Sequence, residues 1–127
     1  MQAARDTISP LLGQAPDPAL VRQIEELVTA HPQVVGVHDL VVHDYGPGRR
    51  IISLHAEVPA DGELLEMHDA IDNIEMELAR KLRCEAVIHM DPVVVGDPVV
   101  TALREQVTAL VKTIDPRITI HDFRMVP

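Results

Sequence analysis

Aromatic side chains are nearly absent from this chain of 127 residues, which has one Tyr, one Phe and no Trp. Proteins that bind single-stranded nucleic acid stack its bases on aromatic rings, and contact with phosphates requires a basic surface. The formal net charge here is -9 at pH 7. The composition therefore excludes nucleic acid as the expected partner, and the acidic surface favours cations instead.

Cysteine and long apolar runs are scarce as well. Cys84 is the only cysteine, so the chain has no internal disulfide and no thiolate zinc knuckle. No run approaches the ~18 apolar residues of a membrane-spanning helix, and residues 1–6 lack the apolar stretch of a signal peptide. We expect one soluble, cytoplasmic domain without direct membrane insertion, with a core of Val, Ile, Leu, Met and Ala.

The first half of the chain predicts a helix followed by two strands. Asp17-Pro18 is a helix-start signal, and apolar residues at helical spacing extend the helix over about 18–30. β-Branched residues with period-two alternation predict strands over 34–44 and 49–58. Gly46-Pro47 lies between these strands and predicts a turn.

The next segments predict a second helix and a third strand. An apolar stripe marks a helix capped by Asp61, and residues 85–90 are expected to form a short strand closed by Asp91-Pro92. The resulting α-β-β-α-β order is that of an α+β open sandwich with helices on one face of the sheet. We assign this unit to residues 17–92, after a polar lead-in over 1–16.

Residues 93–127 predict a helix-strand extension that repeats the start of the first unit. Asp97-Pro98 opens an amphipathic helix that ends near Ile114, and residues 117–126 are expected to form a strand. A half-unit cannot bury its apolar face alone, so we expect its strand to pair with the sheet of this chain or of another subunit. The repeat has a constant offset of 83 positions and relates Ile24, Leu27, Val28, Val37, His38 and Asp39 to Val107, Leu110, Val111, Ile120, His121 and Asp122.

Two of the seven histidines are predicted to face each other. A hairpin that is symmetric about Gly46-Pro47 places His38 directly opposite His55. The Cβ atoms of such a pair lie ~4.5–5.5 Å apart, which allows both imidazoles to share one ion. The other face of the same strands is expected to belong to the core, through Val35, Val37, Val41, Ile52, Leu54 and Ala56.

Three further residues complete the set of candidate ligands. His89 and Asp91 lie two positions apart at the end of the third strand, so they share one face of it. His68 lies on the second helix, one turn from Asp72. Imidazole together with carboxylate suits zinc and its first-row neighbours rather than calcium or magnesium. From spacing alone, a metal site and a set of solvated surface histidines both remain open.

Four blocks of sequence stand out along the chain. They are Gly36-Val37-His38-Asp39-Leu40 with the Gly46-Pro47 turn, Ile52-Ser53-Leu54-His55-Ala56-Glu57, Met67-His68-Asp69, and His89-Met90-Asp91-Pro92. In their order and spacing these blocks resemble the cytoplasmic C-terminal domain of cation diffusion facilitator transporters. The resemblance extends from about Leu12 to Pro92, and the tail from Asp97 is similar to an extension found in some bacterial members.

This resemblance implies a ferredoxin-like or metallochaperone-like fold, a homodimer, and metal ions bound at or near the dimer interface. It implies Zn²⁺ as the first metal to consider, with Fe, Mn, Co or Cd as the other metals of the family. The family's ligands fall on His38, His55, His89 and Asp91, with His68 of the partner subunit reaching across. Transport in the family is performed by a membrane domain, so this domain is expected to regulate a cation efflux transporter by closing when metal binds.

Two other classes of function are weighed against this one. The first is a stand-alone soluble metal buffer or metallochaperone. A metallochaperone would need an exposed, exchangeable site, typically thiolate-based for copper, and the single Cys84 counts against it. An enzyme is disfavoured, because no general base is placed beside the predicted ligands. His31 and His43 match no ligand position and are expected to be exposed, and His121 is left out because its partners are missing from the partial repeat.

Overall fold

The computed structural model describes residue 8 and residues 15–45 and 48–125, and it confirms an α+β fold. The elements are α2 (Pro18–Thr29), β1 (Gly36–Asp44), β2 (Arg50–Pro59), α3 (Leu64–Leu82), β3 (Cys84–Val93) and α4 (Pro98–Ile114). The predicted turn at Gly46-Pro47 and nearly all of the lead-in over 1–16 lie outside the described residues. No helix in the described ranges is both long and apolar enough to span a membrane.

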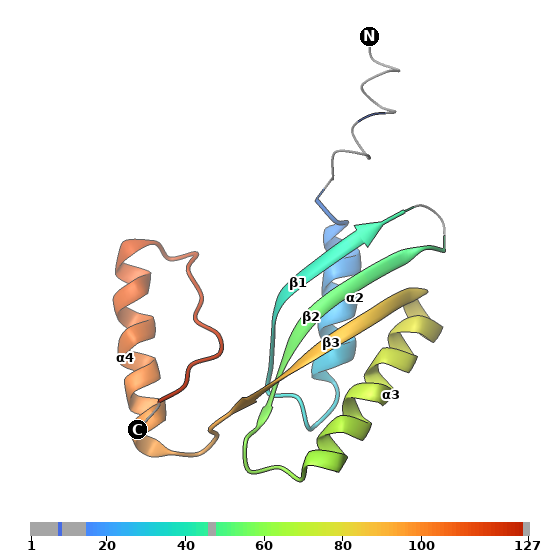
Figure 1. The fold of residues 1–127 in the computed structure, drawn as a ribbon. Helices are drawn as coiled ribbons and strands as arrows, with labels where there is room; N and C mark the ends of the chain where they lie inside the picture. The colour runs from blue at the N-terminus through green and yellow to red at the C-terminus, as the bar shows by residue number, and fades with distance from the viewer. Residues whose placement is uncertain (1–7, 9–14, 46–47, 126–127) are drawn as a thin grey trace.

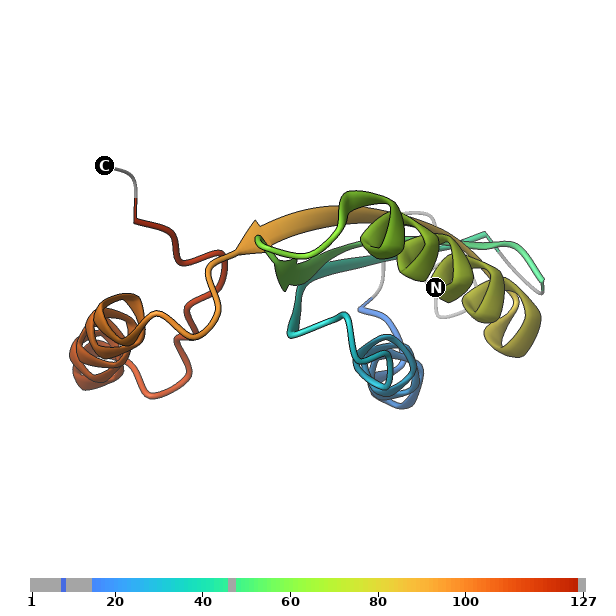
Figure 2. The ribbon, with the colours of Figure 1, turned by 90° about the horizontal axis from the view of Figure 1, so that it is seen from below.

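Helices α2 and α3 cover one face of a three-stranded sheet (Figures 1 and 2). The strand order is β1-β2-β3, with β1 antiparallel to β2 and β2 parallel to β3. A parallel pair needs a crossover connection, which α3 provides. We call the uncovered face of the sheet the open face. The core between the sheet and the two helices is aliphatic, and its buried members include Ile24, Val28, Ile52, Leu54, Ala56, Ile71, Ile74, Leu78 and Ile88.

A β-bulge in β1 determines which side chains reach the open face. β1 pairs with β2 in regular register from Gly36 to His38, and the register shifts between His38 and Val41. Asp39, inside the shift, has a φ of 51°, a left-handed conformation that Asp tolerates better than most residues. The shift leaves Val41 45% exposed and turns Val42 toward the core. The prediction that Val41 belongs to the core is therefore wrong.

Three other predictions about boundaries and burial need correction. Val35 precedes β1 and is 47% exposed rather than buried. α3 is capped by Glu63 rather than Asp61, because the Glu63 carboxylate accepts the backbone N–H of Glu66 at 2.9 Å. β3 does not end at the predicted Asp-Pro step but continues past Pro92. An edge strand tolerates proline because only one of its two sides is hydrogen-bonded.

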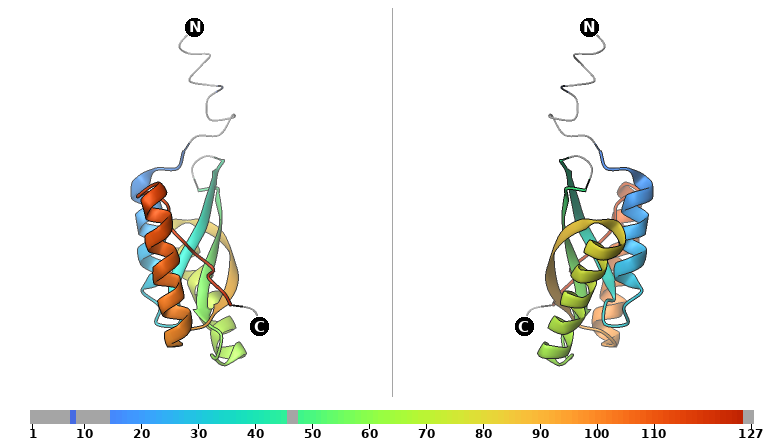
Figure 3. Two further views of the ribbon diagram at one scale, coloured as in Figure 1. Left: turned by 90° about the vertical axis from the view of Figure 1, so that its left-hand side faces the viewer. Right: turned by 90° about the vertical axis from the view of Figure 1, so that its right-hand side faces the viewer.

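The C-terminal extension leaves the sheet and then returns to it (Figures 1 and 3). Asp97 caps α4 as predicted, and after α4 the chain runs back in the opposite direction, between that helix and the sheet. We call residues 115–125 the tail. The tail contains no strand, which contradicts the prediction for 117–126 as far as Met125. Asp39 of β1 and Asp122 of the tail both have a positive φ, so neither backbone is extended where the two segments meet.

Candidate metal centre

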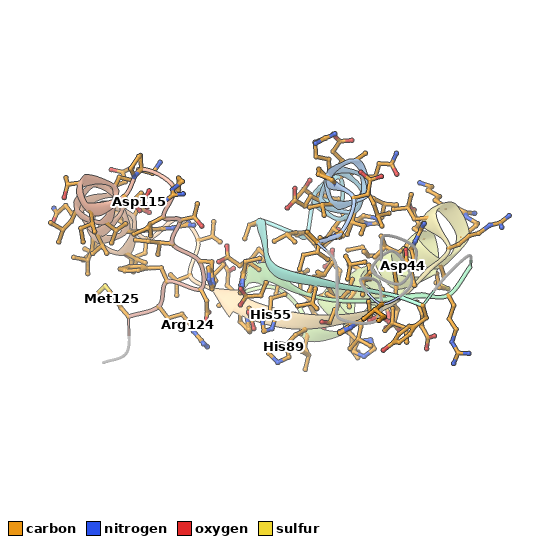
Figure 4. All side chains as sticks on the ribbon, turned by 90° about the horizontal axis from the view of Figure 1, so that it is seen from above. Asp44, His55, His89, Asp115, Arg124 and Met125 are labelled. Atoms are coloured by element: carbon orange, nitrogen blue, oxygen red, sulfur yellow. The ribbon has the colours of Figure 1, made fainter. Side chains whose placement is uncertain are left out.

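Three histidines form a row across the open face, one from each strand. His38 of β1 pairs with His55 of β2, and His55 pairs with His89 of β3. The ring centroids are 5.1 Å apart for His38 and His55 and 4.7 Å apart for His55 and His89. Because side chains alternate along a strand, these rings point away from the core, as His55 and His89 do in Figure 4.

A buried carboxylate joins the three rings. Asp91 lies two residues beyond His89 in β3 and is 6% exposed. Its Oδ2 is 2.8 Å from Nδ1 of His55 and 3.2 Å from Nε2 of His38, and its Oδ1 is 2.8 Å from Nδ1 of His89. We call these four residues the Asp91 centre. Because each strand supplies at least one of them, the centre depends on the sheet register rather than on a local motif.

Opposing effects set the pKa of Asp91. Burial acts to raise it, because a buried carboxylate loses hydration. Hydrogen bonds and charge interactions with His55, and then with His89, outweigh burial and hold the pKa below the ordinary value for Asp. The carboxylate is therefore ionised at neutral pH, which is the state that ligates a metal.

The burial of His38 provides a test of whether these residues fit a cation. Its side chain is 9% exposed, and within the described part of the chain neither ring nitrogen makes a hydrogen bond of acceptable geometry. This includes Nε2, although Oδ2 of Asp91 is only 3.2 Å away. Buried polar atoms are nearly always satisfied, because they lose their hydration on burial. A cation ligated by His38 would satisfy one of these nitrogens.

The spacing of the donor atoms also fits a small cation. One donor atom each from His38, His55 and Asp91 lies within 4.8 Å of the other two. Ligands about 2.0–2.1 Å from a tetrahedral Zn²⁺ are about 3.3 Å from one another. Oδ2 of Asp91 lies 2.8 Å from the His55 nitrogen and 3.2 Å from the His38 nitrogen, so these donor atoms need to move apart only slightly to admit an ion. His89 faces the other oxygen of Asp91 and is not part of this group of three.

His68 and His31 are two of the four histidines that lie outside the centre. His68 is 66% exposed on α3, with its Nδ1 3.4 Å from Asp72, and α3 covers the opposite face of the sheet. The prediction that His31 is exposed is wrong: only 21% of its side chain is accessible, and its Nε2 lies 4.0 Å from Oε1 of Glu77. Within one chain, therefore, the structure brings together four of the five predicted site residues and leaves His68 apart.

His121 and Asp39, neither of which was predicted to be a metal ligand, lie beside His38. The His121 ring stacks on the His38 ring, with centroids 4.0 Å apart and planes inclined by 23°. His38, Asp39 and His121 each place one donor atom within 4.8 Å of the other two. The signal in the sequence was the repeat, which relates His121 to His38. It could not show that the two copies touch.

An open hollow of about 800 Å³ lies along α3. It is acidic, but it includes none of the Asp91 centre. Exposed acidic groups are common in proteins without a bound ion, whereas the Asp91 centre combines burial with converging donors of two kinds. The hollow is lined by His31, Gln33, Glu63, Leu65, Glu66, Asp69, Ala70, Asn73, Met76, Glu77 and Arg80.

Comparison with known proteins places the chain in a family of transporter domains. The model of the family described as the cytoplasmic domain of cation efflux proteins matches residues 16–93, and the chain belongs to this family. The resemblance predicted from the sequence is therefore confirmed, and with it the cytoplasmic assignment. The family is not one of enzymes.

Individual relatives agree with this assignment. The cation-efflux pump FieF of Salmonella typhi is 32% identical over 88 residues, which are 68% of this chain and 29% of FieF. Two structures of CzrB, a protein named as a candidate zinc transporter, have TM-scores of 0.57 and 0.56 and identities of 28% and 26%. The matches cover 62% and 63% of this chain and 99% and 92% of the chains in those two structures, and the second structure is a zinc form.

A further solved structure supports the fold alone. The metal-bound C-terminal domain of the CzcD transporter from Thermotoga maritima has a TM-score of 0.53 at 21% identity, and the match covers 63% of this chain and 92% of that one. Together with CzrB it confirms the ferredoxin-like α+β fold. The matched part spans less than a third of the length of FieF.

Proposed function

We propose that this chain is the metal-sensing regulatory and dimerisation domain of a cation efflux transporter, with the Asp91 centre as its divalent-cation site. The observation that carries the proposal is the Asp91 carboxylate, which is 6% exposed and contacted by imidazoles from all three strands. A buried ionised carboxylate is costly without a positive partner. A divalent ion held by Asp91, His38 and His55 supplies that partner.

Zn²⁺ is the metal that we propose first. Two imidazole nitrogens with a carboxylate oxygen suit Zn²⁺ and also Fe, Mn, Co or Cd, whereas Ca²⁺ and Mg²⁺ prefer oxygen ligands alone. The zinc form of CzrB supports this order. The alternative function is that of a stand-alone soluble metal buffer or metallochaperone, and a metallochaperone with a thiolate site is less well supported. Cys84 is fully buried, and burial raises the pKa of its thiol, so the metal-binding thiolate is disfavoured.

His89 and His68 are proposed to complete the ligand set. The His89 side chain is 68% exposed, and its Nδ1 contacts Oδ1 of Asp91. It can therefore ligate a second ion, which the Asp91 carboxylate would bridge to the ion held by His38 and His55. His68 is exposed on α3, which makes it available to another molecule. We infer that His68 of the partner subunit reaches the Asp91 centre across the dimer interface.

Metal binding is proposed to close the dimer by reducing charge repulsion. Each chain has a formal charge of -9, so two copies repel each other, and bound divalent ions cancel part of that charge. An ion that binds the closed arrangement more tightly than the open one shifts the equilibrium toward closure. In a complete transporter this closure would be passed on to the membrane domain.

The protein is expected to be a dimer even without metal. Val41 and Val87 lie on either side of Ser53 on the open face and are 45% and 63% exposed. Adjacent apolar side chains exposed on one face favour association, because their contact removes apolar surface from water. Sedimentation at tens of micromolar protein, with a chelator present, measures the oligomeric state. A single monomeric species would contradict the proposed dimer.

Replacing His55 with Ala should weaken Zn²⁺ binding by about tenfold or more, because it deletes a ligand that lies 2.8 Å from the Asp91 carboxylate. Calorimetric titration with Zn²⁺ at neutral pH measures the change. His43→Ala is the matched control, since His43 belongs to the same hairpin but stacks against Tyr45 instead. Equal affinities for the two variants would rule out the Asp91 centre as the main site.

A further inference from the structure

The two copies of a repeated His-Asp dipeptide face each other in this fold. His38-Asp39 belongs to the bulge of β1, and His121-Asp122 belongs to the tail, 83 positions later. The two aspartates have the same left-handed backbone, with φ of 51° for Asp39 and 50° for Asp122. The repeat is therefore one of local backbone shape as well as of sequence, and it brings a second histidine against His38.

The side chains at this junction form a second set of converging donors. The rings of His38 and His121 stack at 4.0 Å, and the Asp39 carboxylate lies beside both of them. Oδ2 of Asp39 is 3.4 Å from Nδ1 of His38, and Oδ1 is 3.9 Å from Nε2 of His121. Each carboxylate oxygen thus faces one ring nitrogen, and the His38 nitrogen is buried and lacks a hydrogen-bond partner in the described structure.

The tail is held in place by contacts that involve a buried residue. The backbone N–H of Asp122 donates to Oε1 of Glu57 at 2.7 Å, and Glu57 is 5% exposed on the open face. Gly36 provides the space for this carboxylate, since a Cβ at that position would lie 2.5 Å from Oε2 of Glu57. Arg124 donates to Asp122 at 2.8 Å and lies on the same side of the sheet as His55 in Figure 4. The position of His121 is therefore fixed by the residue that follows it.

We propose that His38, Asp39 and His121 form a second divalent-cation site, which we call the tail site. Its donors, two imidazole nitrogens and one carboxylate, are of the same kind as those of the Asp91 centre, so it takes the same class of first-row divalent ion. The family model ends at residue 93, so His121 lies outside the part of the chain that it matches. The proposal does not depend on occupancy of the Asp91 centre.

The two sites share His38 and therefore compete for it. Its Nε2 faces Asp91 and its Nδ1 faces Asp39. A neutral imidazole has one lone pair and one N–H. An ion at the tail site takes the lone pair on Nδ1, which places the proton on Nε2, where it is directed at Asp91. An ion ligated by Nε2 requires the opposite tautomer. The tail thus reduces the affinity of the Asp91 centre whenever its own site is filled.

The test measures Zn²⁺ binding in a protein whose Asp91 centre has been weakened. In the full chain carrying Asp91→Asn, weaker binding should remain, because all three residues of the tail site are intact. Adding His121→Ala or Asp39→Asn should reduce this remaining affinity by about tenfold or more. Adding His43→Ala should leave it within about twofold. Asn suits position 39 as the replacement, because it removes the charge and tolerates a left-handed backbone.

Calorimetry and nitrogen-15 NMR of the histidine rings distinguish the outcomes. The tail site predicts that Zn²⁺ shifts Nδ1 of His38 and Nε2 of His121 in the Asp91→Asn protein. Loss of all binding in that protein, or remaining binding that His121→Ala leaves unchanged, would overturn the tail site. If Asp91→Asn alone left the affinity of the wild-type chain unaltered, the proposed function would fail instead, and the effect of His121→Ala would still decide the tail site.

Discussion

Replacing Asp91 with Asn is expected to lower the affinity for Zn²⁺ by about 100-fold or more. Asp91 is the one negatively charged donor in its centre, and its two oxygens contact all three imidazoles at 2.8 to 3.2 Å. Asn has nearly the same shape, so the sheet should be retained. However, its amide is neutral, and its N–H₂ group cannot ligate a cation. Calorimetric titration at neutral pH measures the loss.

Asp61→Asn is the matched control for this prediction. It removes the same charge by the same change, but Asp61 is exposed in the turn between β2 and α3 and is not part of the Asp91 centre. Its replacement should leave Zn²⁺ affinity nearly unchanged. Similar losses for Asp61→Asn and Asp91→Asn would indicate that Zn²⁺ responds to the total negative charge of the protein rather than to one centre.

Lowering the pH from 7.5 to 5.5 should remove most of the stabilisation of the fold by Zn²⁺. Protons compete with the ion for the lone pairs of imidazoles, whose ordinary pKa is about 6.5. Two ligating imidazoles of ordinary pKa should lower the affinity by about 100-fold over the whole range from pH 7.5 to 5.5. A ligand that binds only the folded state raises the melting temperature according to its affinity. Zn²⁺ should therefore raise the melting temperature clearly at pH 7.5 and scarcely at pH 5.5.

Asp91 does not contribute to this pH dependence. Its folded-state pKa lies below the ordinary value, so the carboxylate is ionised throughout the range from 5.5 to 7.5. The stability that this lowered pKa contributes is present above the unfolded value of about 3.9 and is lost as the pH falls through the folded-state pKa. Melting temperatures measured with and without Zn²⁺ at both pH values check the prediction. An equal shift at pH 7.5 and 5.5 would mean that carboxylates, and not histidines, hold the ion.

The pairing of His38 with His55 was predicted correctly from sequence, but only because two errors cancelled: the register next to the turn was wrong by one residue, and the bulge was not foreseen. Symmetry about the Gly46-Pro47 turn places Asp44 opposite Arg49, whereas the structure pairs Asp44 with Arg50. The bulge then shifts the register by one residue and restores the predicted pair. A bulge is not visible in hydrophobic alternation, and for the same reason Val41 was wrongly assigned to the core.

The role of Asp91 could be predicted only in part. Alternation along one strand placed Asp91 and His89 on one face, which β3 confirms. Contact with His55 depends on the parallel register of β2 and β3, two strands that α3 separates in the sequence, so no local pattern near the site specifies it. The docking of the tail was beyond prediction, because its contacts depend on left-handed backbones at Asp39 and Asp122.

Anomalous diffraction at the zinc absorption edge, from crystals grown with Zn²⁺, locates the bound ion without reference to affinity. We expect a strong peak on the open face, within ligand distance of Asp91, His38 and His55. A peak confined to the acidic hollow along α3, or a map without any peak beside Asp91, would show that the Asp91 centre is not the metal site.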